Sequence, residues 1–275
     1  MKEILPSYDF LGAVYRGSKS FELKEALNSI VSQTLSPKNV FIIIDGFISK
    51  EVHNCLEEYK KKLPLKLIKL KKNKGLGLAL RAGLKECESK IILRFDTDDI
   101  NLKNRAYLQV KEIVNSNADI IGSQVYEFIR DPNEHIFTKL MPINHEEIKR
   151  QIIFRNPINH PTVAFRRDSI LNLNGGYRNC PLYEDYDLWI RAMFNGLKFK
   201  NIPKNLVAMR IKTQRSRRRG LSLIKKEIIL IFTFFEISFL LGIIFIPIFL
   251  IRSMIAILPQ NIFNFFVCRL FRKKL

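Results

Sequence analysis

The chain has 275 residues, of which 47% are hydrophobic and 26% are charged. These fractions exclude an intrinsically disordered, collagen-like or disulfide-scaffold protein. Lys and Arg together number 46 against 26 Asp and Glu, so the formal net charge is +20. A surplus of this size indicates an anionic partner, either nucleic acid or a membrane surface.

The basic surplus is unevenly distributed. Residues 212–275 contain 12 basic and 2 acidic side chains, whereas the residues before them contain 34 basic and 24 acidic ones. We therefore predict a domain over 1–211, a basic segment over 212–227 and a hydrophobic tail over 228–275. The first ten residues contain no apolar signal-peptide core. We expect the first domain to stay in the cytoplasm.

Apolar runs and amphipathic segments alternate over the first hundred residues. In chain order we expect a strand at 10–15, a helix at 23–35, a strand at 40–44, a helix at 49–62, a strand at 65–70, a helix at 76–88 and a strand at 91–95. The β-branched run from Val40 to Ile44 is typical of a strand buried on both faces. This alternation predicts an α/β fold with a mixed, mostly parallel sheet and helices on both faces.

Beyond residue 100 the alternation loosens. Here we expect a helix at 103–116, a strand at 119–123, and helices at 145–154 and 185–195. Ligands of doubly wound sheets bind beyond the carboxyl ends of the strands. The residues that directly follow each strand are therefore the candidates for function.

Carboxylates follow two of the expected strands. Asp45 ends the second strand, and Asp96, Asp98 and Asp99 follow the fourth. Like charges this close repel, and a divalent cation such as Mg²⁺ or Mn²⁺ relieves the repulsion. The pattern predicts a metal–diphosphate site. The alternatives are helix capping by the Asp cluster, and a simple Asp-Gly turn at Asp45.

Eight short motifs occur in a fixed order along the first domain. They are Ala13-Val14-Tyr15, Leu27 to Thr34, Ile44-Asp45-Gly46, Asn73 to Leu80, Phe95 to Asp99, Asn159-His160-Pro161, Gly175 to Arg178, and Glu184 to Trp189. Each is weak alone, but the ordered set resembles glycosyltransferase family 2, whose members have the GT-A fold. The resemblance covers about residues 8–211. It is nearest to the exopolysaccharide branch of the amylovoran-biosynthesis type, whose members also have a single Asp before the Gly.

The resemblance implies a role for each matching residue. The donor side would be formed by Val14, Tyr15, Asp45, Asn73, Arg94, Asp96 and His160. Asp96 and Asp98 would hold the metal, Asp185 would be the catalytic base, and Glu184, Asp185 and Trp189 would face the acceptor. We weigh helix capping as the alternative for Glu184 and Asp185, a structural histidine for His160, and charge-balancing ion pairs for Arg94 and Arg105.

The tail contains a 24-residue run from Ile228 to Ile251 with one charge, Glu236. Such a run is long enough to cross a bilayer. A single span, a re-entrant hairpin that turns near Pro247, and an interfacial helix after Arg252 all remain open. Glu236 is unfavourable in lipid unless it has a partner.

We therefore expect an inverting, metal-dependent glycosyltransferase. It would use a nucleotide sugar, with UDP-sugars the first choice, and a lipid-linked glycan acceptor in bacterial capsule, exopolysaccharide or O-antigen synthesis. Because the basic cluster adjoins an apolar run, we expect an anionic membrane and no nucleic acid as partner, at the cytoplasmic face of the inner membrane. The alternatives are a polyprenyl-phosphate sugar synthase of the same fold and a catalytically inactive membrane adaptor.

Overall fold

The computed structural model describes residues 5–211, 221–257 and 273–274. These residues form a ten-stranded mixed sheet in which β10-β7-β6-β8-β4-β1-β2-β3 lie in this order, and β9 pairs with β6 and β5. The strands are β1 (Tyr8–Tyr15), β2 (Asn39–Asp45), β3 (Leu65–Leu70), β4 (Ile91–Arg94), β5 (Ile100–Asn101), β6 (Ile120–Phe128), β7 (Phe137–Lys139), β8 (Ala164–Arg166), β9 (Phe199–Arg210) and β10 (Lys273–Lys274).

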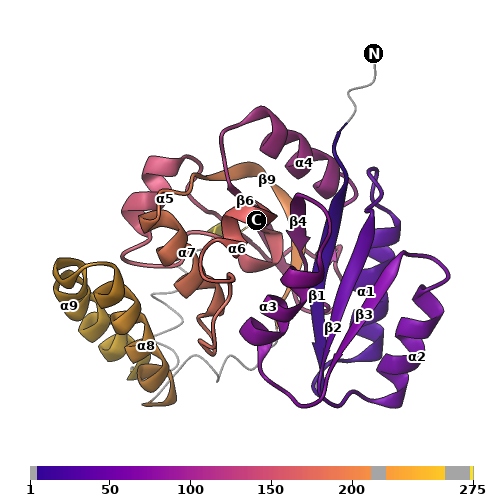
Figure 1. Ribbon diagram of the computed structural model, residues 1–275, viewed down its shortest axis with the longest axis horizontal. Coiled ribbons are helices and arrows are strands. Elements are labelled where there is room, and N and C mark those ends of the chain that lie inside the picture. The colour runs from indigo at the N-terminus through magenta and orange to yellow at the C-terminus, as the bar shows by residue number, and fades with distance from the viewer. Residues whose placement is uncertain (1–4, 212–220, 258–272, 275) are drawn as a thin grey trace.

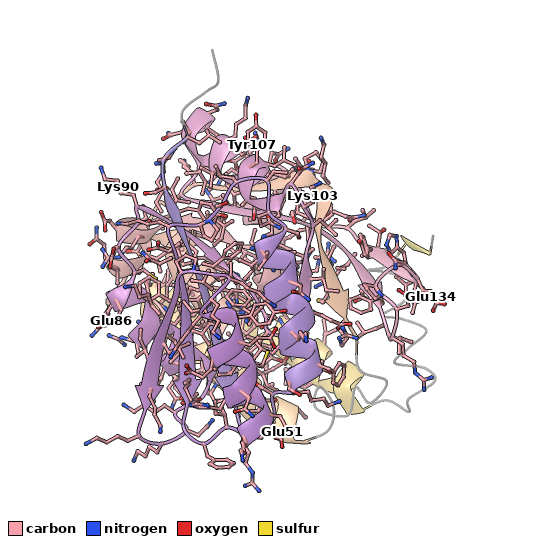
Figure 2. All side chains as sticks on the ribbon, turned by 90° about the vertical axis from the view of Figure 1, so that its right-hand side faces the viewer. Glu51, Glu86, Lys90, Lys103, Tyr107 and Glu134 are labelled. Carbon is pink, nitrogen blue, oxygen red and sulfur yellow. The ribbon has the colours of Figure 1, made fainter. Side chains whose placement is uncertain are left out.

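Helices cover both faces of this sheet. One face carries α1 (Ser20–Val31), α2 (Lys50–Tyr59) and α4 (Arg105–Asn115). The other carries α3 (Leu76–Glu86), α5 (His145–Gln151), α6 (Arg167–Leu171) and α7 (Glu184–Phe194). Figure 2 views the molecule from the side of β3, and the exposed side chains of Glu51, Lys103 and Tyr107 point outwards.

The two hydrophobic cores follow from the alternation of side chains along each strand. On β1, Phe10 and Val14 pack under α1 and α2, whereas Leu11 packs against α3. On β2, Ile42 packs on the side of α1 and α2, and Ile43 packs on the side of α3. Strands β3, β2, β1 and β4 are mutually parallel. The α/β fold with a mixed, mostly parallel sheet is therefore confirmed.

The second half of the domain contains strands that the sequence does not predict. The strand expected at 119–123 continues to Phe128, and the twelve-residue strand β9 runs parallel to it through nine paired residues. The register of this pair shifts near Gln124, opposite a stretch of β9 that contains Pro203. The shift breaks the alternation of period two, so no strand pattern is visible in the sequence of β9.

The apolar tail folds as two helices rather than one. Helix α8 (Leu221–Ile237) and helix α9 (Phe239–Ile257) pack against each other on either side of Ser238, and we call the pair the C-terminal hairpin. Of the three alternatives for the tail, a single 24-residue helix does not form. A hairpin does form, but it turns at Ser238 and not near Pro247, which lies inside α9. Among the described residues, no helix has the length and apolarity needed to cross a bilayer. Residues 212–220 of the basic segment and 258–272 of the tail lie outside the described residues.

The C-terminal hairpin lies beside α7, at the end of the molecule remote from β3 (Figure 1). Leu230, Phe234 and Phe245 are fully buried and belong to the same core as α3 and α7. Gly242 permits the close packing of the two helices, since a Cβ there would lie 2.3 Å from the Phe235 ring. One face of the hairpin is therefore part of the hydrophobic core of the first domain.

The outward face of the C-terminal hairpin is apolar and exposed. Phe239 is 74% exposed and Met254 is 71% exposed. The other exposed apolar side chains of the hairpin are Ile228, Phe232, Leu240, Ile243, Ile244, Ile246, Leu250 and Ile251. An unbroken exposed set of this size is unusual for a surface in contact with water alone.

Candidate active site

A pocket of about 500 Å³ opens at the carboxyl ends of β1, β2 and β4. This volume suits a nucleotide-sized ligand. Its walls come from segments that are far apart in the sequence. Of the residues predicted for the site, those that line it are Tyr15, Asp45, Asn73, Asp96, Asp98 and Glu184. The topology therefore brings together side chains from five separate motifs.

Asp45 forms one wall of the pocket at the end of β2. Its carboxylate accepts hydrogen bonds from the backbone N–H groups of Lys74 (2.7 Å) and Gly75 (2.9 Å), just before α3. Asn73 Nδ2 donates to the Asp45 carbonyl at 3.2 Å. A Cβ on Gly46, which has φ +79°, would lie 2.6 Å from the Asn73 nitrogen. Asp45 thus closes a turn and still faces the pocket.

The acidic turn after β4 forms the floor of the pocket. Carboxylate oxygens of Asp96, Asp98 and Asp99 lie within 4.8 Å of one another. Burial and the neighbouring carboxylates of Asp98 and Asp96 raise the pKa of Asp99 well above its usual range. Three hard oxygen donors that repel one another fit a divalent cation. Asp96 and Asp98, which line the pocket, are the residues that would hold one.

Arg210, at the end of β9, holds the acidic turn after β4 in place through hydrogen bonds. Its backbone N–H donates to Asp99 Oδ1 at 2.8 Å, and its Nε donates to the Asp98 carbonyl at 3.2 Å. Its guanidinium also pairs with Glu25 on α1 and lies over the Phe128 ring. The sequence offers no sign of this role, because the residues involved are more than a hundred positions apart.

The start of α7 contributes the opposite wall. Glu184 lines the pocket, and burial together with the charge of Asp185 raises its pKa from 4.5 to about 7. Asp185 lies outside the pocket lining, where its Oδ2 accepts a hydrogen bond from Asn156 Nδ2 at 2.7 Å. Asp187 forms a buried ion pair with Arg191 at 2.8 Å. The acidic residues of this motif therefore have different surroundings.

Glu184→Gln should stabilise the metal-free protein at pH 8 but not at pH 5. The raised pKa means that the folded state prefers protonated Glu184, so stability is lost as pH rises from about 4.5 through about 7. The neutral amide of glutamine does not titrate, so the variant does not lose this stability as the pH rises. We expect a gain in unfolding free energy of about 1–2 kcal/mol at pH 8, reduced from the full linkage value because the side chain is partly exposed. Thermal or urea unfolding in EDTA at both pH values measures it, and an equal effect at both would contradict it.

Besides Asp185, four predicted site residues lie outside the pocket lining. Val14 points into the core under α1, because side chains alternate along β1 and its neighbours Ala13 and Tyr15 face the pocket. Arg94 is 1% exposed and forms an ion pair with Asp96. Arg94 therefore lies beneath the acidic turn and does not line the site predicted for the sugar donor.

His160 and Trp189 also lie in the protein interior. His160 Nε2 is 3.0 Å from the Tyr177 hydroxyl, and its ring packs edge-on against Trp189. Burial and nearby Arg94 lower the pKa of His160 well below its usual range. Trp189 is fully buried in the core of α7. Both side chains therefore pack in the core next to the site and do not line the pocket.

The segment 178–182, of which residues 179–182 line the pocket, is a further part of the site that the site prediction omits. Leu182 lines the pocket and has a φ of +74°, which a non-glycine residue rarely adopts. A Cβ on Gly77 would lie 2.2 Å from the Arg178 carbonyl oxygen, so α3 and this segment are in direct contact. The positive φ at a leucine has no signal in the sequence.

The profile of glycosyl transferase family 2 matches residues 19–173. The chain therefore belongs to this family, and it is a glycosyltransferase with a GT-A-like fold.

Two of its relatives are bacterial enzymes named for polysaccharide or glycolipid synthesis. The chain is 37% identical over 222 residues to the UDP-Gal:alpha-D-GlcNAc-diphosphoundecaprenol beta-1,3-galactosyltransferase of Escherichia coli, covering 80% of each. It is 31% identical over 264 residues to the amylovoran biosynthesis glycosyltransferase AmsE of Erwinia amylovora, covering 94% of this chain and 97% of that one. The resemblance to the amylovoran type is thus confirmed.

Solved structures share the fold at lower identity. Residues 1–349 of S. aureus TarS in complex with UDP-GlcNAc match 96% of this chain and 72% of that one, with a TM-score of 0.65 and 17% identity. The mannosyltransferase PcManGT from Pyrobaculum calidifontis, in complex with GDP-Man and Mn²⁺, matches 97% of this chain and 80% of that one, with a TM-score of 0.62 and 13% identity.

Proposed function

We propose that the chain transfers a sugar from a nucleoside diphosphate donor, with UDP-sugars the first choice, to a lipid-linked glycan in bacterial surface polysaccharide synthesis. The observation that carries the proposal is the cluster of Asp96, Asp98 and Asp99, of which Asp96 and Asp98 line a pocket at the carboxyl ends of parallel strands. The relatives of Escherichia coli and Erwinia amylovora, by their names, act in related syntheses.

The donor would lie along the pocket from Asp45 to the acidic turn. Asp45 and Asn73 would face the base, and the ends of Asp96 and Asp98 would face the diphosphate. A Mg²⁺ or Mn²⁺ ion held by Asp96 and Asp98 would neutralise the diphosphate as it leaves. Arg94, paired with Asp96 from below, would keep that carboxylate in a fixed orientation.

Transfer would invert the configuration of the sugar. The acceptor hydroxyl attacks the anomeric carbon opposite the diphosphate, the bond to the diphosphate breaks, and a base removes the hydroxyl proton. We assign Asp185 as this base, because the family resemblance places it there and Asn156 orients its carboxylate. Glu184, on the pocket wall beside it, would contact the reacting sugars.

The test uses the full chain, purified in detergent, with UDP-galactose, UDP-glucose, UDP-GlcNAc and GDP-mannose in the presence of Mg²⁺ or Mn²⁺. Release of nucleoside diphosphate should depend on one donor and on a GlcNAc-diphosphate lipid as acceptor. Release that requires only polyprenyl phosphate would indicate a sugar–lipid synthase instead. No release from any donor with either acceptor would overturn the proposal.

We further propose that the outward face of the C-terminal hairpin docks on the cytoplasmic leaflet of the inner membrane. The exposed apolar side chains listed above would enter the interface, and the seven basic residues between Lys212 and Lys226 would bind anionic lipid. A lipid-linked acceptor is found at the same surface. The charged side chains of the described hairpin residues Glu227 and Glu236 form ion pairs with Arg252 and Arg178.

Phe239→Ser should weaken binding to vesicles of phosphatidylethanolamine and phosphatidylglycerol about tenfold. Loss of one aromatic side chain from an apolar interface removes about 1.5 kcal/mol or more. Flotation of the vesicles measures the bound fraction. The matched control is Phe47→Ser, because Phe47 is also 74% exposed but lies at the turn after β2. Equal loss for both variants, or none for Phe239→Ser, would contradict membrane docking through the hairpin.

A further inference from the structure

The inward face of the C-terminal hairpin carries polar side chains that contact α7 and the segment before it. Thr233 Oγ1 donates to Asp187 Oδ1 at 2.9 Å, and Arg178 pairs with Glu236 at 2.6 Å. These contacts join α8 to both sides of the segment that forms the pocket wall. The family profile ends at residue 173, so it includes neither partner.

A third contact involves both helices of the C-terminal hairpin. Glu227 of α8, whose side chain is 4% exposed, accepts hydrogen bonds on Oε1 from the Tyr183 hydroxyl at 2.8 Å and from Arg252 Nη2 at 2.7 Å. Arg252 of α9 also lies 5.7 Å from the centre of the Tyr186 ring. We call Tyr183, Glu227 and Arg252 the Tyr183 cluster.

Tyr183 lies between two residues of the pocket wall. It caps the start of α7, directly before Glu184, and it directly follows Leu182 with its positive φ. Its backbone N–H donates to the Cys180 carbonyl at 2.9 Å, which closes the turn. A leucine holds a left-handed conformation only where surrounding contacts impose it. The hydrogen bond to Glu227 anchors the side chain next to this residue.

We propose that the Tyr183 cluster positions Leu182 and Glu184 of the pocket wall, and Asp185 beside them, for sugar transfer. Glu227 and Arg252 act as positioning residues: they hold Tyr183, and Tyr183 fixes the direction in which α7 begins. This inference rests on the proposed function and extends it, because it makes the C-terminal hairpin a part of the catalytic apparatus. Small displacements of a group that contacts the reacting atoms reduce turnover strongly.

Tyr183→Phe removes only the hydroxyl that Glu227 binds. We expect kcat for transfer to fall about tenfold, with the Kd for UDP within about twofold of wild type, because the residues around Asp45 are unchanged. The matched control is Tyr59→Phe. Tyr59 is fully buried, and its hydroxyl donates to Asn28 and Lys24 at the α1–α2 contact. None of these three residues lines the pocket. We expect this variant to keep the wild-type kcat.

Two substitutions of Glu227 separate positioning from general stability. Glu227→Gln keeps an acceptor oxygen for the Tyr183 hydroxyl, so kcat should stay within about threefold of wild type. Glu227→Leu removes it and should match Tyr183→Phe. The double variant Tyr183→Phe/Glu227→Leu should be no slower than the slower single variant, since both changes break one contact. All rates are measured well below the Tm of each variant.

Hydrogen exchange provides a readout that needs no activity. Amides of residues 182–188 should exchange about tenfold faster in Tyr183→Phe than in wild type, and at the wild-type rate in Tyr59→Phe. Unchanged exchange, or faster exchange with unchanged kcat, would overturn the proposal. So would a Glu227→Gln variant as slow as Glu227→Leu. A wild-type chain that releases no diphosphate from any donor would overturn the proposed function, and the exchange of residues 182–188 would then decide the inference alone.

Discussion

Asp98→Asn should reduce sugar transfer about a thousandfold at saturating donor. The substitution removes one of the two charges that would hold the cation against the diphosphate, and a bound metal contributes several kcal/mol of charge stabilisation to such a reaction. The carboxylate cluster itself should remain folded, because Asp99 keeps its hydrogen bond from the Arg210 backbone. The measurement is nucleoside diphosphate release as a function of Mg²⁺ or Mn²⁺ concentration.

The control for this variant is Asp168→Asn. Its carboxylate is 74% exposed and lies on α6, away from the pocket, so the same chemical change should leave the rate and the metal dependence unaltered. Transfer by Asp98→Asn at more than a tenth of the wild-type rate, with the same metal dependence, would exclude Asp98 as a metal ligand.

Asp185→Asn should lower kcat by two to four orders of magnitude while leaving UDP binding intact. A positioned general base contributes about 10²–10⁴-fold to proton transfer, and an amide cannot accept the proton. Because Asp185 lies outside the donor pocket lining, the substitution should not change the Kd for UDP. Isothermal titration with UDP, together with initial rates at saturating donor and acceptor, separates the two effects.

Glu184→Gln is the natural comparison for Asp185→Asn. Glu184 lines the pocket, so this variant should raise the KM for donor or acceptor while retaining transfer above that of Asp185→Asn. The opposite order, with Glu184→Gln inactive and Asp185→Asn active, would assign the base to Glu184. The raised pKa of Glu184, about 7, would then appear as an increase of kcat with pH through that value.

The parallel half of the sheet is predictable from the sequence because each element has a strong local pattern. The continuous apolar run at β2 and the helical stripe of α1 can each be recognised within a short window of the sequence. The observed strand Leu65–Leu70 coincides with the predicted one. The carboxylates after β2 and β4 then meet because parallel strands end at one edge.

The remainder of the site depends on contacts between distant segments. Arg210 reaches the acidic turn only because β9 pairs with β6 and β5, and Pro203 and a register shift obscure that strand in the sequence. Alternation along β1 excludes Val14 from the pocket, although it lies in a matching motif. Burial of Trp189 and His160 likewise follows from tertiary packing, which a motif match does not describe.

The charge and hydropathy of the chain change abruptly near residue 212, and a biochemist who wished to avoid detergent would end the protein there. The C-terminal hairpin makes this a poor choice. Leu230, Phe234 and Phe245 fill space behind α7, so their removal would open that core to water and leave Asp187 without the Thr233 hydroxyl. The exposed apolar surface and the side chains that pack behind α7 are two faces of the C-terminal hairpin. The protein should therefore be purified as the whole chain, in detergent.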